Sequence, residues 1–135
     1  MNFPFLGRRR EDTRAHDAEG IGDLLADCDL LRSQAVREGV RLDDSELSLE
    51  QLDQMLPRWR SDEEILAWLG NDAGLYLGTV IVRTVPGAAW SIRSDGQPVV
   101  RLASGREFDV VASGHAWAED GVPELSQLYG EVAEA

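Results

Sequence analysis

Residues 68–85, WLGNDAGLYLGTVIVRTV, constrain the fold more than any other stretch of the sequence. They are almost wholly apolar and carry only two charges, Asp72 and Arg83, so this segment must be buried. As a helix, the segment places Gly74 and Gly78 four residues apart on one face, where another backbone can come close. As a strand, its β-branched C-terminal part fits nearly as well, and the spacing alone does not decide between the two.

The flanking residues favour the helix. Gly70 is a stop signal for a preceding helix, and Asn71 with Asp72 supplies a cap for a new one. Pro86-Gly87 then ends the new helix. We therefore predict a central helix that begins after Gly70 and is separate from the helix before it.

Composition indicates one soluble domain. The chain has 135 residues, of which 43% are hydrophobic and 28% are charged, and this is ordinary for a globular protein with a single core. No run approaches the ~20 apolar residues of a membrane-spanning helix once Arg83 and the glycines are counted. We predict a single domain over residues 21–135 and a flexible basic and apolar tail over residues 1–20. Contact of this tail with a membrane surface is a less favoured alternative to a frayed or docked tail.

The charge and the cysteine content narrow the partners and the compartment. The net charge of −12 argues against a nucleic-acid partner, because phosphate binding draws on clustered cations. Cys28 is the only cysteine, which excludes an internal disulfide and a cysteine-rich metal site and fits a reducing cytoplasm. It lies in an apolar stripe, so we expect a core side chain and not a nucleophile. The N-terminus has its apolar residues before its basic ones, the reverse of a secretory signal, and we expect a cytoplasmic protein.

Helical spacing and capping signals predict three elements before the central run. They are an amphipathic helix over 21–38 with Gly39 as its stop, a helix over 48–56 opened by Ser48 and Gln51 and closed by Pro57, and a helix over 61–69 opened by Ser61 and Glu64.

After the central run the pattern alternates, which predicts short strands over 90–93, 99–102 and 106–110 with glycine-containing turns between them. Asp109 is expected to cap a helix over 110–118, and Pro123 to occupy the first position of a last helix. A sheet this small needs a helix across its apolar face. The predicted fold class is α+β, with helices packed on a small three-stranded antiparallel sheet.

The sequence resembles a family of small uncharacterised actinobacterial proteins, a domain-of-unknown-function family typical of streptomycetes. The resemblance rests on the blocks LLRSQAVREGVRLDDS, LDQMLPRWR, LGNDAGLYLGTVIVRTVPGAAW, GQPVVRLASGREFDVVASGHAWA and PELSQLYGEVAEA. It covers the chain from about Gly22 to the end together with the Phe-Pro-Phe-Leu start, and it implies a cytoplasmic bacterial protein without an assigned reaction. More loosely, a helix with a Tyr-Leu-Gly motif followed by Trp and a small sheet is similar to domains found among bacterial immunity-like and other interaction proteins, which concerns the fold alone.

The sequence shows no catalytic or metal-binding set, and we expect no cofactor and no metal. The two histidines are His16 in the tail and His115 in a predicted helix, where Ser113 and Glu119 do not both share its face. The regular spacing of four in GNDAGLYLG indicates a close helix contact and not a phosphate loop. Four acidic residues lie close together in the sequence, Asp43, Asp44, Glu46 and Asp53. They lack the glycine and the alternating ligands of a calcium-binding loop.

Two functions from different classes remain. The favoured one is a non-enzymatic binding or regulatory protein that recognises another protein, because tryptophan and arginine dominate binding hot spots. Its candidate residues are Trp59, Trp90, Arg93, Arg101 and Trp117. The alternative is a small-molecule binder or enzyme with a pocket between the central helix and the sheet. Its candidate residues are Tyr76, Arg83, Asp109 and His115.

Overall fold

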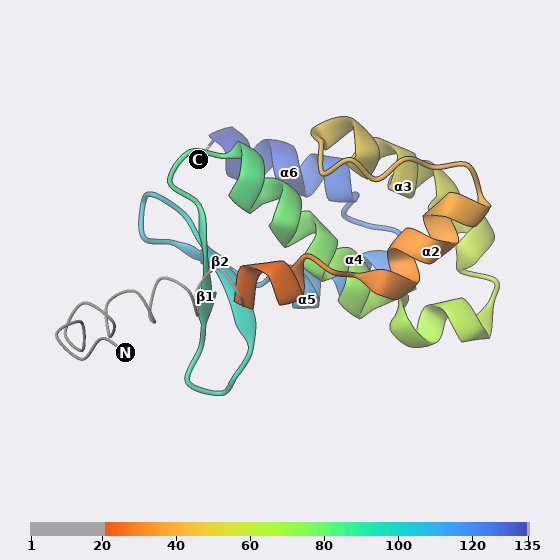
Figure 1. Ribbon diagram of the computed structural model, residues 1–135, viewed down its shortest axis with the longest axis horizontal. Helices are drawn as coiled ribbons and strands as arrows, with labels where there is room; N and C mark the ends of the chain where they lie inside the picture. The colour runs from red at the N-terminus through yellow and green to blue at the C-terminus, as the bar shows by residue number, and fades with distance from the viewer. Residues whose placement is uncertain (1–20, 135) are drawn as a thin grey trace, which may run out of the picture.

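The computed structural model describes residues 21–134 and has the predicted α+β fold (Figure 1). Helices surround one long central helix, and a small sheet lies at one end of the molecule. After a helical segment at 21–25, the elements in chain order are α2 Asp29–Arg37, α3 Glu46–Trp59, α4 Glu63–Thr84, β1 Ala89–Ile92, β2 Pro98–Arg101, β3 Glu107–Phe108, α5 Val110–Asp120 and α6 Leu125–Glu134.

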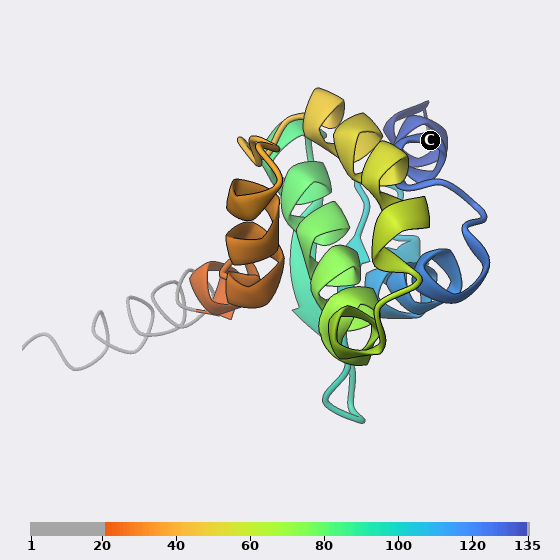
Figure 2. The same cartoon turned by 90° about the vertical axis from the view of Figure 1, so that its right-hand side faces the viewer.

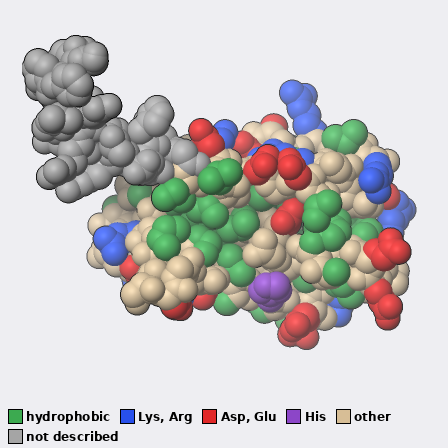
Figure 3. Space-filling view, turned by 60° about the horizontal axis from the view of Figure 1, so that its bottom comes forward, with side chains coloured by type: hydrophobic (Ala, Val, Ile, Leu, Met, Phe, Trp, Pro, Cys, Tyr) green, Lys and Arg blue, Asp and Glu red, His purple; other side chains and the backbone are tan. Residues whose placement is uncertain are grey.

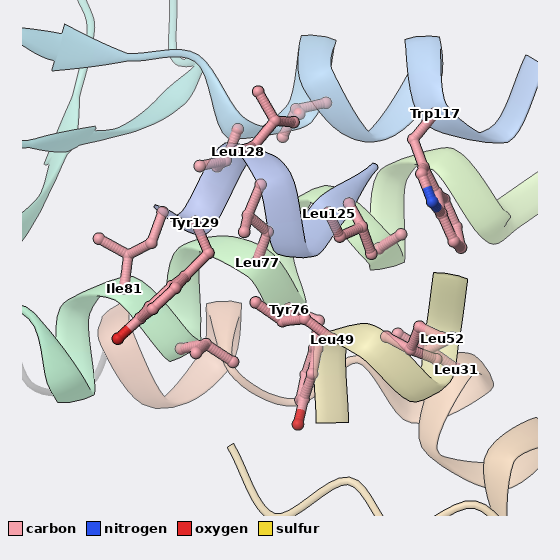
Figure 4. Packing of buried hydrophobic residues seen from close by; sticks show 14 of the residues in the cluster. Leu31, Leu49, Leu52, Tyr76, Leu77, Ile81, Trp117, Leu125, Leu128 and Tyr129 are labelled. Atoms are coloured by element: carbon pink, nitrogen blue, oxygen red, sulfur yellow. The ribbon is translucent and has the colours of Figure 1, made fainter. Parts of the chain in front are cut away.

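Helix α4 is the centre of the fold, as its apolar sequence predicts. Figure 2 shows it running between α2 and α3, and its residues from Leu69 to Ile81 are mostly buried. Figure 4 shows Leu77 and Ile81 packed among side chains of α6. The core therefore forms around this helix, with apolar residues contributed by the other helices and by β2.

The prediction that Gly70 stops one helix and that another begins after it is wrong, because α4 is continuous. Its N-cap is Asp62, whose carboxylate accepts hydrogen bonds from the main-chain N–H groups of Glu64 and Ile65. Gly70 and Gly74 instead allow α5 to cross α4 in backbone contact, since a Cβ atom placed on Gly114 would lie 2.2 Å from the Gly70 carbonyl oxygen. The close helix contact expected from the glycine spacing is confirmed at Gly74, but Gly78 faces the ring of Trp90 and not another helix.

The predicted helix over 21–38 is broken at Cys28. Residues 21–25 are helical, and Cys28 then adopts a left-handed conformation with φ of 44° before α2 begins at Asp29. The break interrupts the helix, and the single apolar stripe of the prediction does not form. Leu24 and Val36 of that stripe are 73% and 77% exposed.

Helix α3 begins earlier and ends later than predicted. Ser45 is its N-cap and accepts a hydrogen bond from the main-chain N–H of Ser48, which itself lies inside the helix. Pro57 does not close the helix, because the proline stands in the last turn and the hydrogen bond from Arg60 N to the Leu56 carbonyl continues that turn past it.

The predicted three-stranded antiparallel meander is present, in the order β1-β2-β3. Trp90 on β1 packs its ring against Gly78 of α4, where a Cβ atom would lie 2.3 Å from the ring, so α4 covers the sheet as predicted. The third strand is shorter than 106–110, because Asp109 already caps α5 through the N–H of Ala112. Pro123 lies before α6 and not at its first position.

Helix α4 is also long and apolar enough to cross a membrane, which differs from the expectation from sequence. It has 22 residues, and its most apolar 18-residue window has a mean hydropathy of 1.4. Of that window, 56% is buried inside the protein. The core helix of a soluble protein meets the same criteria of length and composition as a membrane span.

Candidate functional site: the groove between α2 and α4

A groove lies where α2, the end of α3 and the start of α4 meet. It consists of two adjoining hollows of about 740 and 380 Å³. Both hollows are lined by the same five residues, so they form one continuous depression, which we call the α2–α4 groove. These shared residues are Gln34, Glu38, Asp62, Glu64 and Ile65.

Two local interactions lie at the groove. Arg58 of α3 forms an ion pair with Glu38 at the end of α2, with 2.5 Å between guanidinium nitrogen and carboxylate oxygen. Asp62 fixes the first turn of α4 by capping it. The groove is therefore built from three elements that are separated in sequence, and each of them places side chains on its wall.

The groove carries more negative than positive side chains. Four carboxylates line it, from Glu38, Asp62, Glu63 and Glu64, against the two guanidinium groups of Arg37 and Arg58. Within residues 21–134, the two glutamates of α4 make no ion pair with Lys, Arg or His. Apolar surface accompanies these charges, from residues on α2 and α4. It is contributed by Leu30, Ile65 and Trp68.

Trp59 lines the larger hollow and carries an unsatisfied polar atom. Its side chain is only 1% exposed. Its Nε1–H is the one buried side-chain polar group in the described part of the chain that has no hydrogen-bond partner. Buried N–H groups are nearly always paired, and an unpaired one costs about 1–3 kcal/mol. Trp59 lines the hollow but its Nε1 atom is covered, so an acceptor that enters the groove reaches this donor only when neighbouring side chains move.

The structure places the predicted binding residues in three different environments. Trp59 and Trp117 are core residues, with exposures of 1% and 0%, so they do not form the surface of exposed tryptophans expected from the sequence. Trp90 is half-buried against α4. Arg93 and Arg101 are exposed on the sheet but are already paired with carboxylates, each at 3.1 Å; the partners are Asp109 and Glu107.

The residues of the alternative pocket are not brought together. The hollow between α4 and β1 measures about 150 Å³, and of the four predicted residues only Arg83 lines it. His115 is exposed, and as the one histidine among the described residues it is the purple side chain on the surface in Figure 3. It lines a different hollow, together with Arg60 and Glu119. Asp109 is occupied in capping α5 and in its pair with Arg93. Within residues 21–134, Arg83 and His115 line two different hollows and so do not face one common pocket.

Tyr76 instead belongs to a structural network around Asp44. The Tyr76 hydroxyl accepts a hydrogen bond from the main-chain N–H of Asp44 and shares one with the Ser48 hydroxyl. The carboxylate of Asp44 pairs with Arg32 at 3.0 Å and with Arg83 at 2.8 Å. Burial raises the pKa of the Tyr76 hydroxyl, so it stays protonated and holds the loop before α3 against α4.

Cys28 is buried, as predicted. Burial, with the nearby Asp72 carboxylate as the next contribution, raises the pKa of its thiol to about 12. The nucleophilic form of a cysteine is the thiolate, and this environment suppresses it at neutral pH. Among residues 21–134, no group of three His, Cys, Asp or Glu side chains lies close enough to hold a metal ion.

The comparisons with known proteins define the family of this chain and nothing finer. Neither the curated proteins nor the solved structures contain a significant match to it. The family described as "Family of unknown function (DUF6278)" matches residues 1–135. Because this match covers the whole chain, the protein belongs to the DUF6278 family.

Proposed function

We propose that this chain is a non-enzymatic binding protein that recognises another protein, and that the α2–α4 groove is where it does so. The observation that carries the proposal is the buried, unpaired Nε1–H of Trp59 on the groove wall. An unpaired buried donor lowers the stability of the fold, and an acceptor supplied by a partner removes this cost on binding.

The composition of the groove also supports a protein partner. Apolar side chains of α2 and α4 lie beside charged ones, and Leu30 is 52% exposed while Trp68 is half-buried. Protein interfaces combine such an apolar centre with a polar rim. Three residues of the rival pocket, Tyr76, Arg83 and Asp109, are in contrast occupied in structural hydrogen bonds and ion pairs.

Origin and compartment belong to the same proposal. We propose an actinobacterial protein of the cytoplasm, supported by the blocks that resemble streptomycete proteins and by the single buried cysteine. The arginines of the sheet remain a second candidate surface, since both are exposed at its rim.

Crosslinking in cells of the source organism tests the proposal. The full chain and two variants are compared for the proteins that they capture. Trp59→Phe removes the unpaired donor from the groove, while Arg93→Gln with Arg101→Gln changes only the sheet. A specific crosslinked protein that is lost in the groove variant and kept in the sheet variant is the expected result. Loss in the sheet variant alone would transfer the function to the sheet, and equal capture by all three would end the proposal.

A further inference from the structure

We infer that the α2–α4 groove takes a basic, extended segment of the partner: a main-chain carbonyl of that segment accepts the hydrogen bond from Trp59, and its Arg or Lys side chains meet the carboxylates of the groove. This inference rests on the proposed function and specifies the chemistry of the partner. Two independent features of the groove support this inference: one favours the cationic side chains, and the other favours the main-chain carbonyl.

The first feature is the charge that remains after internal pairing. Arg58 is engaged by Glu38, and Asp62 is engaged in capping α4. Arg37 lines the smaller hollow and makes no ion pair within residues 21–134, so it offsets one negative charge of the groove. Glu63 and Glu64 are exposed and make no ion pair within residues 21–134. These two carboxylates can bind guanidinium or ammonium groups in charge-assisted hydrogen bonds. A cationic side chain is therefore favoured at the mouth of the groove.

The second feature is the unpaired donor. The Nε1–H of Trp59 needs an acceptor oxygen, and the surrounding carboxylates disfavour an anionic one. A neutral carbonyl is the acceptor that fits both conditions. A peptide main chain supplies such a carbonyl at every residue, and it supplies cations through its side chains. A polyamine offers cations without an acceptor, and an acidic peptide offers acceptors without cations.

The burial of Trp59 adds a consequence that can be measured. Its Nε1 atom is covered in the free protein, so an acceptor reaches it only when side chains of the groove wall move. Gln34 lines both hollows and is only 9% exposed, so it is a buried part of the groove wall. Binding must therefore change the chemical environment of the Trp59 indole N–H.

Nuclear magnetic resonance of the ¹⁵N-labelled full chain tests the inference directly. The four indole N–H groups give separate signals, and Trp59→Phe identifies the signal of Trp59. The probe is the peptide acetyl-Gly-Arg-Arg-Arg-Gly-amide at low salt. We expect it to shift the Trp59 signal and to leave the Trp117 signal in place, and we expect Glu63→Gln with Glu64→Gln to weaken binding by about fivefold. Far-ultraviolet circular dichroism confirms that the variants are folded.

Two further probes and one further variant make the result decisive. The peptide acetyl-Gly-Glu-Glu-Glu-Gly-amide and spermidine should leave the Trp59 signal unshifted, and an equal shift with either would overturn the inference. The chain has its own arginine run, Arg8 to Arg10, so the triple Arg→Gln variant is titrated in parallel. If the peptide shifts the Trp59 signal only in the Arg8–Arg10 variant, the inference still holds, because the chain's own arginines then compete with the peptide for the groove. No shift of Trp59 in either protein overturns the inference, while crosslinking to a partner judges the proposed function separately.

Discussion

Two buried tryptophans of this protein differ in one atom's environment. Trp117 on α5 donates its Nε1–H to the carboxylate of Asp53 on α3 at 2.9 Å, whereas the same atom of Trp59 has no acceptor. Both side chains are almost fully buried. Packing is thus comparable at the two places, and the difference lies in whether the polar group of the ring is satisfied.

The satisfied tryptophan belongs to a junction that is structural. The carboxylate of Asp53 also accepts hydrogen bonds from the main-chain N–H groups of Leu125 and Ser126 and from the Ser126 hydroxyl. One side chain of α3 therefore caps α6 and anchors α5. A helix start needs such acceptors, and here a distant residue supplies them. The buried Nε1–H of Trp117 is thus paired within the framework of the fold, whereas the unpaired Nε1–H of Trp59 belongs to a residue that lines the groove.

The largest effect is expected from removing Asp53. Asp53→Ala leaves four buried or half-buried donors without their acceptor, and we expect the free energy of unfolding to fall by at least ~3 kcal/mol. Urea denaturation measures this loss. Asp95→Ala is the matched control, because the Asp95 carboxylate accepts a hydrogen bond only from Gln97 N, in an exposed turn, and should cost less than ~1 kcal/mol. Similar losses for the two variants would refute the structural role of Asp53.

The next effect compares the tryptophans themselves. Trp117→Phe and Trp59→Phe both shrink a buried ring, which costs a similar packing energy. Trp117→Phe also removes a hydrogen bond, whereas Trp59→Phe removes an unpaired donor, so we expect Trp117→Phe to be more destabilising by about 1–3 kcal/mol. Denaturation of both variants under the same conditions measures the difference. Equal losses of unfolding free energy would show that the unpaired Trp59 donor does not lower stability, and the main argument for binding at the groove would fail.

Local signals in the sequence were sufficient for much of this framework. The apolar run predicts the central position of α4, because so many apolar residues have no other place to go. Asp109 predicts the start of α5, since an N-cap acts within three residues of itself. The turns at Gly96 and Gly105 have positive φ, as glycine in a hairpin permits. In each of these cases cause and effect lie close together in the chain.

The errors concern interactions between distant parts of the chain. Gly70 looks like a helix stop until α5 is known to cross it, and Asp53 looks like a surface acid until α6 docks on it. Cys28 adopts a left-handed conformation that its residue type does not announce. The α2–α4 groove is built from three separate elements, so no single stretch of the sequence announces it. The helix start predicted there at Ser61 and Glu64 is displaced by one residue, because Asp62 is the N-cap.

The smallest effect on stability, and the sharpest test of the groove, is expected from Arg58→Gln. The Arg58 side chain is 70% exposed, so losing its ion pair with Glu38 should cost less than ~1 kcal/mol. Removing one of the two cations of the groove should nevertheless tighten binding of the tri-arginine peptide by roughly three- to tenfold at low salt, read from the Trp59 indole signal. Arg101→Gln removes the same charge from an exposed ion pair on the sheet and should leave the affinity within about twofold. If both variants bind the peptide with the same affinity, the net charge of the whole protein attracts it, and the peptide does not bind specifically in the groove.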